Sequence, residues 1–373
     1  MNVLAQNRFG FDCLLFERCN MNCSFCLEDH SNSEIDLEWI RNMPQKLLER
    51  FKEEDLPDIH KITFRYWGGE LFFDELPDSL FLEYRELINK VNELFHKEFP
   101  NIELSHSWVS NGVYKNIDRV IELLKDTGSQ LSISYDPVGR YQKSWQESFA
   151  LRNIAKFHSE GLLAEISITL TKPNIEAYIS GKSCLRNLVF CKKFDINYYI
   201  PNKNWQELLP SDEDLFNFFK WVVDWRLFCI IDVSRVLRSI LYPTANIEKV
   251  CNCDHHISAC KGCLTYNCVT SSTVFPNKDF YGNREITEKN VAKVKQQLGL
   301  MKRGCMFCKY SNICPKCCYT SILYKDYKVT ECPFKKLYEY ISDHQEILED
   351  FKEWEKGMNV ASLWGKRNNN EVI

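Results

Sequence analysis

The chain has 373 residues, of which 45% are hydrophobic and 26% are charged, a balance typical of a soluble globular protein. Its net charge of −4, from 47 basic and 51 acidic side chains, gives no reason to expect a nucleic acid as its partner. No apolar run approaches the ~18 residues of a transmembrane helix, and Met1–Phe16 lacks the pattern of a signal peptide, so we expect a cytoplasmic protein that spans no membrane.

Residues 11 to about 230 alternate short β-rich runs with amphipathic stretches. The predicted strands, in chain order, are Phe11–Phe16, Lys61–Tyr66, Ile102–Val109, Leu131–Tyr135, Ala164–Leu170 and Ile196–Ile200. Helices are predicted between them where apolar residues recur at spacings of three and four, as over Ser79–Phe99, Ile117–Thr127 and Trp145–Glu160. Strands that alternate with helices predict a parallel sheet with right-handed crossovers. Six such units can close most of a barrel or lie as an open sheet, and the pattern alone does not decide between these.

Three cysteines follow the first predicted strand. Cys19, Cys23 and Cys26 are spaced C-x3-C-x2-C, with Phe25 before the third. Iron–sulfur clusters with four irons usually take four thiolates, so three thiolates on one loop leave one iron open. An α-amino acid can chelate that iron, and an electron passed from it to a sulfonium can break a carbon–sulfur bond and release a carbon radical. A structural zinc site is disfavoured because it needs a second cysteine pair roughly 12 to 20 residues further on, and none is there.

Polar and glycine residues stand at the ends of the next strands. The second predicted strand ends in Trp67-Gly68-Gly69-Glu70, the third in Ser110-Asn111-Gly112, and the fourth in a segment that contains Ser134 and Asp136. The carboxyl ends of parallel strands meet at one edge of a sheet, where active sites of this class lie. Glycines there let the backbone approach a ligand, so a Cβ at position 69 is expected to block cofactor binding and to leave iron binding intact.

Cysteine is the outlier of the composition, with 18 residues. Eleven of them crowd between Cys251 and Cys332, and in a reducing compartment such clusters are metal ligands more often than disulfides. This stretch has little helical periodicity, so bound metal is expected to order it. A helical segment is predicted from Pro333 to about Lys356. The expected domains are residues 1–235, residues 236–332, and residues 333–373 with a polar tail.

The loop of Cys19, Cys23 and Cys26 resembles the signature of the radical S-adenosylmethionine superfamily. Gly68, Gly69 and Glu70 resemble its G-G-E motif, which meets the methionine amino group. Asn111 and Ser134 lie in segments similar to those that touch the nucleoside or the methionine carboxylate. The array of Cys305, Cys308, Cys314 and Cys318 resembles the SPASM domain. The resemblance implies a partial (β/α)6 TIM-like barrel, followed by a small cysteine-rich SPASM domain with iron–sulfur clusters and a C-terminal helix.

The same resemblance implies two auxiliary clusters and distributes their ligands. The outer cluster takes Cys305, Cys308, Cys314 and Cys332, and the inner cluster takes Cys253, Cys260 and Cys318. The hairpin cysteine of the family is replaced here by Asn277. If Ser271 and Ser272 form a two-residue turn, Cys268 points to the same side as Asn277, so we expect Cys268 as the fourth inner ligand. Cys263, Cys251 and an open iron remain alternatives.

A zinc ribbon is the rival interpretation of the C-terminal array. It would use Cys305, Cys308, Cys314 and Cys317. Only five residues separate its two pairs, whereas a ribbon needs roughly fifteen. Zinc is therefore disfavoured here as well.

The function implied is that of a radical S-adenosylmethionine oxidoreductase with three [4Fe-4S] clusters, one catalytic and two auxiliary. It would cleave S-adenosyl-L-methionine to a 5′-deoxyadenosyl radical and oxidatively modify, in our expectation cross-link, side chains of a ribosomally made precursor peptide. A radical dehydrogenase of a sugar or alcohol is one alternative. Sulfatase maturation is another, but that group has proline-cysteine-aspartate where this chain has Pro276-Asn277-Lys278. A cluster or zinc protein without catalysis is the remaining class, and no catalytic base is assigned.

The expected partners follow from the same resemblance. They are the precursor peptide and an electron donor of the flavodoxin or ferredoxin type. Only about ten residues precede the first predicted strand, so a precursor is expected to be held by the barrel mouth, the SPASM surface or a separate peptide-recognition protein.

Overall fold

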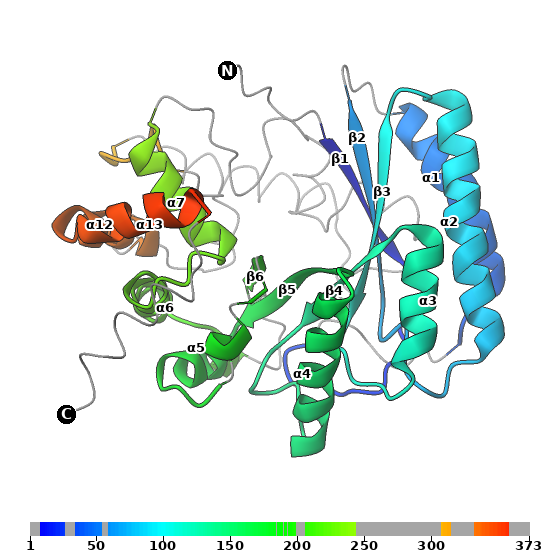
Figure 1. Cartoon of the computed structure of the whole chain (residues 1–373), viewed down its shortest axis with the longest axis horizontal. Helices are drawn as coiled ribbons and strands as arrows, with labels where there is room; N and C mark the ends of the chain where they lie inside the picture. Colours follow the sequence, from blue (N-terminus) through cyan, green and yellow to red (C-terminus); the bar gives the residue numbers. More distant parts are fainter. Residues whose placement is uncertain are drawn as a thin grey trace.

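Figure 1 shows the chain as a computed structural model. The structure describes residues 8–26, 34–53, 59–183, 185–188, 190–191, 193–198, 206–243, 307–314 and 332–357. Several predicted cluster ligands lie outside these described residues, namely Cys251, Cys253, Cys260, Cys263, Cys268, Cys305, Cys317 and Cys318. Their roles stay predictions.

Six parallel strands form one sheet in the order β1-β2-β3-β4-β5-β6. They are β1 (Arg8–Leu14), β2 (Lys61–Trp67), β3 (Glu103–Ser110), β4 (Gln130–Ser134), β5 (Leu163–Leu170) and β6 (Phe194–Tyr198). All six strands expected from the sequence are confirmed, with ends that differ by at most three residues. Neighbouring strands are consecutive in the chain, and each pair is parallel, as crossover connections require.

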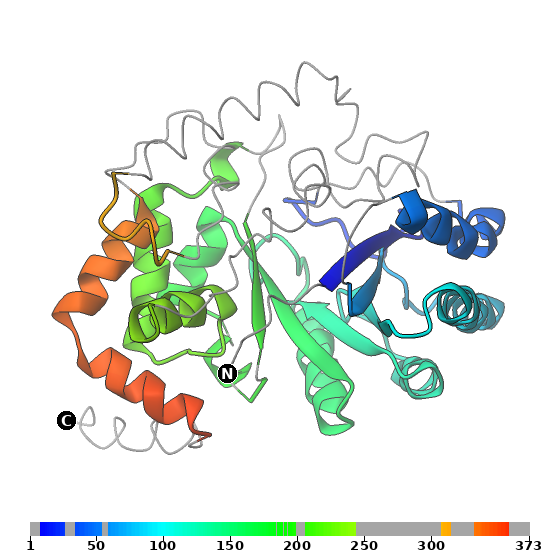
Figure 2. The same cartoon turned by 90° about the horizontal axis from the view of Figure 1, so that it is seen from above.

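Helices follow the strands along one face of this sheet. They are α1 (Leu37–Glu53), α2 (Asp78–Glu98), α3 (Ile117–Thr127), α4 (Ser144–Ser159), α5 (Lys172–Ile179), α6 (Asp212–Asp224) and α7 (Ile231–Leu241), with short 3₁₀ turns at Leu185–Leu188 and Gln206–Leu208. Seen from above, the sheet curves, and α1, α2 and α3 follow one another along its outer side (Figure 2). None of the helices described is long and apolar enough to cross a membrane.

The two faces of the sheet differ in chemistry because successive side chains of a strand point to opposite sides. In β2, Ile62, Phe64 and Tyr66 are fully buried, and Thr63 and Arg65 alternate with them on the other face. The buried face stacks aromatic rings against the helices, as where Phe64 lies 5.1 Å from Phe95 of α2. The concave face carries hydroxyl and charged side chains where a closed barrel has branched apolar residues.

The sheet does not close. In the strand order, β1 and β6 stand at opposite edges of the described sheet, and β6 meets only an isolated bridge from Phe194 to Ile230 on its outer side. The curved, open arrangement is a half-barrel (Figure 2). This confirms the expected partial (β/α)6 barrel over the open-sheet alternative.

The C-terminal part differs from the expectation of one helical segment. It forms two helices, α12 (Pro333–Asp343) and α13 (Glu346–Glu355), which break at His344 and Gln345. α12 packs against α6, and α13 packs against α7, a division that one straight helix could not make (Figure 1). The buried Arg226 after α6 forms an ion pair with Asp350 of α13 and fixes this docking. The boundary expected at residue 235 falls within α7.

Candidate active site at the carboxyl ends of the strands

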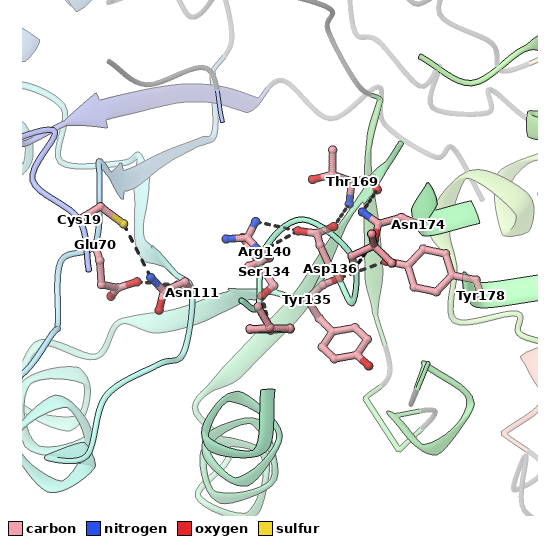
Figure 3. A network of polar contacts seen from close by, with 12 residues as sticks. Cys19, Glu70, Asn111, Ser134, Tyr135, Asp136, Arg140, Thr169, Asn174 and Tyr178 are labelled. Atoms are coloured by element: carbon pink, nitrogen blue, oxygen red, sulfur yellow. Dashed lines mark hydrogen bonds and ion pairs between the residues drawn. The ribbon is translucent and has the colours of Figure 1, made fainter. Parts of the chain in front are cut away.

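The loop that carries the three cysteines is tied to the end of β2 by backbone hydrogen bonds. The Leu15 N–H donates to Trp67 O at 2.9 Å, and the N–H groups of Gly69 and Glu70 donate to Phe16 O and Arg18 O at 2.9 Å each. The chain after β1 therefore runs beside the chain after β2. This contact places Cys19 at the carboxyl edge of the sheet, next to Glu70 and Asn111 (Figure 3).

Gly68 and Gly69 make this close approach possible. A Cβ at Gly68 would lie 2.2 Å from Phe16 O, and a Cβ at Gly69 would lie 2.1 Å from Arg18 O and 2.4 Å from Glu17 O. These distances are far below van der Waals contact, and the atoms met are backbone atoms that cannot swing away. The glycines thus accommodate the cysteine loop itself. A Cβ at position 69 would first meet the backbone beside Cys19, so we now expect it to disturb the cysteine loop as well as cofactor binding.

The three predicted cluster ligands lie together on the loop after β1. Cys19, Cys23 and Cys26 are half-buried there, so each thiol is partly open to solvent. Within the described part of the chain, no three His, Cys, Asp or Glu side chains gather as they would around a single metal ion. The assignment of these three thiols to a cluster therefore stays a prediction from their spacing.

The electrostatic setting of these thiols follows from their burial. Burial raises the pKa of Cys19 to about 12, and the charge of Glu70 adds to the rise. Burial also raises the pKa of Cys23 to about 11, against the opposing charge of Arg140. Raised pKa values favour the protonated form of Cys19 and Cys23, so metal binding to these two thiols would release protons.

Glu70 is fully buried and links the ends of β2 and β3. Its Oε1 accepts hydrogen bonds from Phe72 N at 3.1 Å and from Ser110 Oγ at 2.8 Å, and its Oε2 accepts one from Asn111 N at 2.6 Å. Burial raises the pKa of Glu70 to about 7, although these three donors oppose the rise. The predicted cofactor residue therefore has protein partners on both carboxylate oxygens.

Glu70 makes stability depend on pH in a direction that can be tested. Its pKa in the fold lies above the ordinary value of 4.5, so the folded protein holds a proton that unfolding releases between these values. The stabilisation is present at low pH and is lost as the pH rises through about 7. From pH 5 to pH 8 we expect the advantage of the wild type over Glu70→Gln in free energy of unfolding to shrink by roughly 2 kcal/mol.

Urea unfolding of the metal-free protein at several pH values measures this change. The matched control is Glu160→Gln, since hydrogen bonds from Lys125 and Lys156 lower the pKa of the half-buried Glu160 to about 2, outside the window. The difference in free energy of unfolding between Glu160→Gln and the wild type should stay constant from pH 5 to pH 8. If the free energies of unfolding of the wild type and Glu70→Gln change in parallel between pH 5 and pH 8, Glu70 is ionised over this whole range.

Asn111 and Ser134, the other predicted cofactor residues, differ in their surroundings. The side chain of Asn111 contacts the cysteine loop, where its amide donates to Asn20 Oδ1 at 2.8 Å. The half-buried Ser134 ends β4, and its carbonyl accepts a hydrogen bond from Tyr141 Oη at 3.4 Å. Within the described ranges, the Ser134 hydroxyl makes no hydrogen bond, so it is available to a ligand.

The loop after β4 also holds the cysteine loop, which the sequence did not reveal. The Ser24 N–H donates to Gly139 O at 2.9 Å, and Gly139 has a φ of +83°, a conformation that favours glycine. Arg140 lies 5.3 Å from the centre of the Phe25 ring and binds the buried Asp136 through Nε and Nη2, at 2.8 and 2.7 Å. Figure 3 shows Arg140 paired with Asp136, and the charge of Arg140 acts to lower the pKa of Cys23, against the effect of burial.

Three of the four predicted outer-cluster ligands fall in the described residues. Cys308 and Cys314 are half-buried in the short segment 307–314, and the buried Cys332 is the residue before α12. The segment lies against this helix, where Tyr310 stacks on Tyr338 with ring centres 4.5 Å apart. Burial raises the pKa of Tyr338, and the charges of Cys314 and Cys308 add to the rise, so both thiols are near this ring.

The fold of the chain is similar to that of solved enzyme structures. The chain is similar to an anaerobic sulfatase-maturating enzyme solved with bound AdoMet, with a TM-score of 0.61 and 17% identity over 92% of this chain and 99% of that one. It is also similar to the same enzyme solved with AdoMet and the Cp18Cys peptide, with a TM-score of 0.59, 16% identity and coverage of 92% and 99%. At this identity the likeness shows that the chain has the fold of these enzymes. No family model and no curated protein matches the sequence.

Proposed function

We propose that this chain is a radical S-adenosylmethionine enzyme that oxidatively modifies side chains of a ribosomally made peptide. The observation that carries the proposal is the placement of Cys19, Cys23 and Cys26 on one loop at the carboxyl edge of a half-barrel. The glycine backbone of the β2 end and the unengaged Ser134 hydroxyl share this edge. Enzymes of the same fold have been solved with AdoMet bound.

The residues present fit a four-iron cluster with one open iron. Cys19, Cys23 and Cys26 would hold the cluster, which would supply the electron for reductive cleavage of S-adenosylmethionine to methionine and a 5′-deoxyadenosyl radical, the species that would take a hydrogen atom from the substrate. The protein holds the loop through Gly69 and Asn20, and Ser134 lies at the end of β4 on the same edge of the sheet. Gly68, Gly69, Glu70, Asn111 and Ser134 are the proposed cofactor-binding residues.

Hydrogen abstraction leaves a substrate radical, which must lose one more electron to complete the oxidation. We assign the removal of this electron to two auxiliary clusters. Cys308, Cys314 and Cys332 lie close to one helix, which supports a shared cluster with Cys305. The inner cluster is assigned to Cys253, Cys260, Cys268 and Cys318. An electron donor of the flavodoxin or ferredoxin type completes the system.

Two outcomes for the peptide are considered. Cross-linking of two side chains is our first choice, since Pro276-Asn277-Lys278 lacks the cysteine and aspartate that the hairpin of sulfatase maturases carries. Oxidation of a single side chain is the second candidate, and the observation that favours it is the shared fold with a sulfatase-maturating enzyme solved with a peptide.

Anaerobic incubation of the iron-loaded protein with S-adenosylmethionine and a reductant tests the proposal. We expect 5′-deoxyadenosine, and with short peptides encoded beside the gene we expect a product that has lost two hydrogens. A cross-link suppresses fragmentation between the joined residues in tandem mass spectrometry, whereas single-residue oxidation moves the mass of one residue. An iron-loaded chain that forms no 5′-deoxyadenosine would contradict the proposal.

A further inference from the structure

Asn20 and Asn111 form a closed ring of hydrogen bonds with the backbone of Val113. The Val113 N–H donates to Asn111 Oδ1 at 2.8 Å, Asn111 Nδ2 donates to Asn20 Oδ1 at 2.8 Å, and Asn20 Nδ2 donates to Val113 O at 2.7 Å. The ring joins the cysteine loop, which contains Asn20, to the turn after β3. It bridges two segments that are some 90 residues apart in the chain, since one contact spans 93 positions.

The backbone of Val113 fixes which way both amides point. An N–H can only donate, so Asn111 must present its oxygen to Val113, and a carbonyl can only accept, so Asn20 must present its nitrogen. The amino group of Asn111 is therefore turned toward the cysteine loop. It has two hydrogens, one for Asn20 Oδ1 and a second directed at Cys19 Sγ, which lies 3.9 Å from Asn111 Nδ2.

Buried neighbours hold Asn111 in this position. Its backbone N–H donates to the Glu70 carboxylate at 2.6 Å, and its side chain is almost entirely shielded from solvent, with 4% of its surface exposed. Cys19 Sγ also accepts a hydrogen bond from Met21 N at 3.4 Å. Cys19 Sγ thus has a backbone donor, Met21 N, and a side-chain donor, Asn111 Nδ2, the second of which is drawn in Figure 3.

We propose that Asn111, oriented by Asn20, is a positioning residue that donates a hydrogen bond to the Cys19 sulfur and so raises the reduction potential of the cluster bound there. The inference rests on the proposed function and deepens it, because it assigns to Asn111 a role toward the cluster in addition to any contact with S-adenosylmethionine. A hydrogen bond to a ligating sulfur stabilises the reduced cluster, which carries one more negative charge. Loss of the donor therefore makes reduction harder.

The test is a redox titration of the full, iron-loaded chain without S-adenosylmethionine, followed by electron paramagnetic resonance. The relevant signal is the one that the Cys19, Cys23 and Cys26 triple variant lacks. Asn111→Asp keeps an oxygen for Val113 N–H and loses the donor, and Asn111→Ala loses the donor without adding charge. We expect the ratio of reduced to oxidised cluster at a fixed potential to fall about fivefold in Asn111→Ala, the factor of one weak hydrogen bond, and further in Asn111→Asp.

Asn153→Ala is the matched control. The fully buried Asn153 holds the same turn from α4 through Gly112 O at 2.8 Å and Tyr114 O at 2.9 Å, and no contact with the cysteine loop is found for it in the described residues. Its reduction ratio should equal that of the wild type. An equal shift in Asn153→Ala would mean that the effect of Asn111 is merely structural and would overturn the proposal.

Two further readouts keep the outcomes distinct. If both Asn111 variants titrate like the wild type and only bind S-adenosylmethionine more weakly, Asn111 is a cofactor contact and the inference is wrong. If the Asn111 variants lose the cluster, a variant of the exposed Asn20 tests the inference in their place. Asn20→Ala should release iron to a chelator about fivefold faster than the wild type. An unchanged rate of release overturns the inference. A wild type that holds iron but leaves S-adenosylmethionine intact refutes the proposed function instead.

Discussion

Replacement of Cys19, Cys23 and Cys26 together by alanine is expected to abolish S-adenosylmethionine cleavage and to lower the iron content from roughly twelve to roughly eight per chain, as the predicted three clusters require. The reason is geometric. The three thiols share one loop that is held between the ends of β2 and β4, so the triple substitution removes all of the thiols on this loop. Iron analysis and quantification of 5′-deoxyadenosine after anaerobic reconstitution measure both effects.

Cys191→Ala serves as the control for the loss of a thiol as such. Cys191 is buried in the apolar core near β6, where a free cysteine acts as a small hydrophobic side chain. This variant should keep the full iron content and the cleavage rate, at a modest cost in stability. Cleavage that persists in the triple variant would refute the assignment of the loop.

The barrel could be predicted from the sequence because its signals are local. Alternating Ile62, Phe64 and Tyr66 identify a strand with one buried face, and Val120, Ile121 and Leu124 identify the helix that follows the third strand. The break between α12 and α13 was not predicted from the sequence. Ile341 and Leu348 are seven residues apart and continue the same helical face across the break. The break is set by which helices the two segments pack against.

The sequence indicates candidate ligands for the site but not the residues that hold them in place. Cysteine spacing is a local pattern, and so is a glycine pair at the end of a strand. The cysteine loop is held by contacts between loops that are distant in the chain, made by Asn20, Gly139 and Arg140. No residue type or local spacing predicts such contacts. Gly69 shows the difference most clearly: its presence was predictable, but the neighbour that requires it, Arg18 O, became visible only in the fold.

Gly69→Ala is accordingly expected to disrupt the cluster site and not merely the cofactor pocket. The added methyl group would lie 2.1 Å from Arg18 O and 2.4 Å from Arg18 C, so the cysteine loop or the β2 end must move. Overpacking against backbone typically costs up to about 3 kcal/mol, and here the displaced segment is the residue before Cys19. We expect iron in the first cluster to fall about tenfold and the midpoint of unfolding to drop, as measured by iron analysis and by urea titration.

Gly10→Ala is the matched control because it adds the same methyl group to a glycine in the same sheet. At Gly10 the nearest atom to a new Cβ is Thr63 O at 3.9 Å, an ordinary contact, and the residue is exposed in β1. The substitution should be neutral or slightly stabilising, since alanine restricts the unfolded chain more than glycine does. If Gly69→Ala kept normal iron and lost only S-adenosylmethionine affinity, the loop would be yielding to the methyl group, and the glycine would serve the ligand alone.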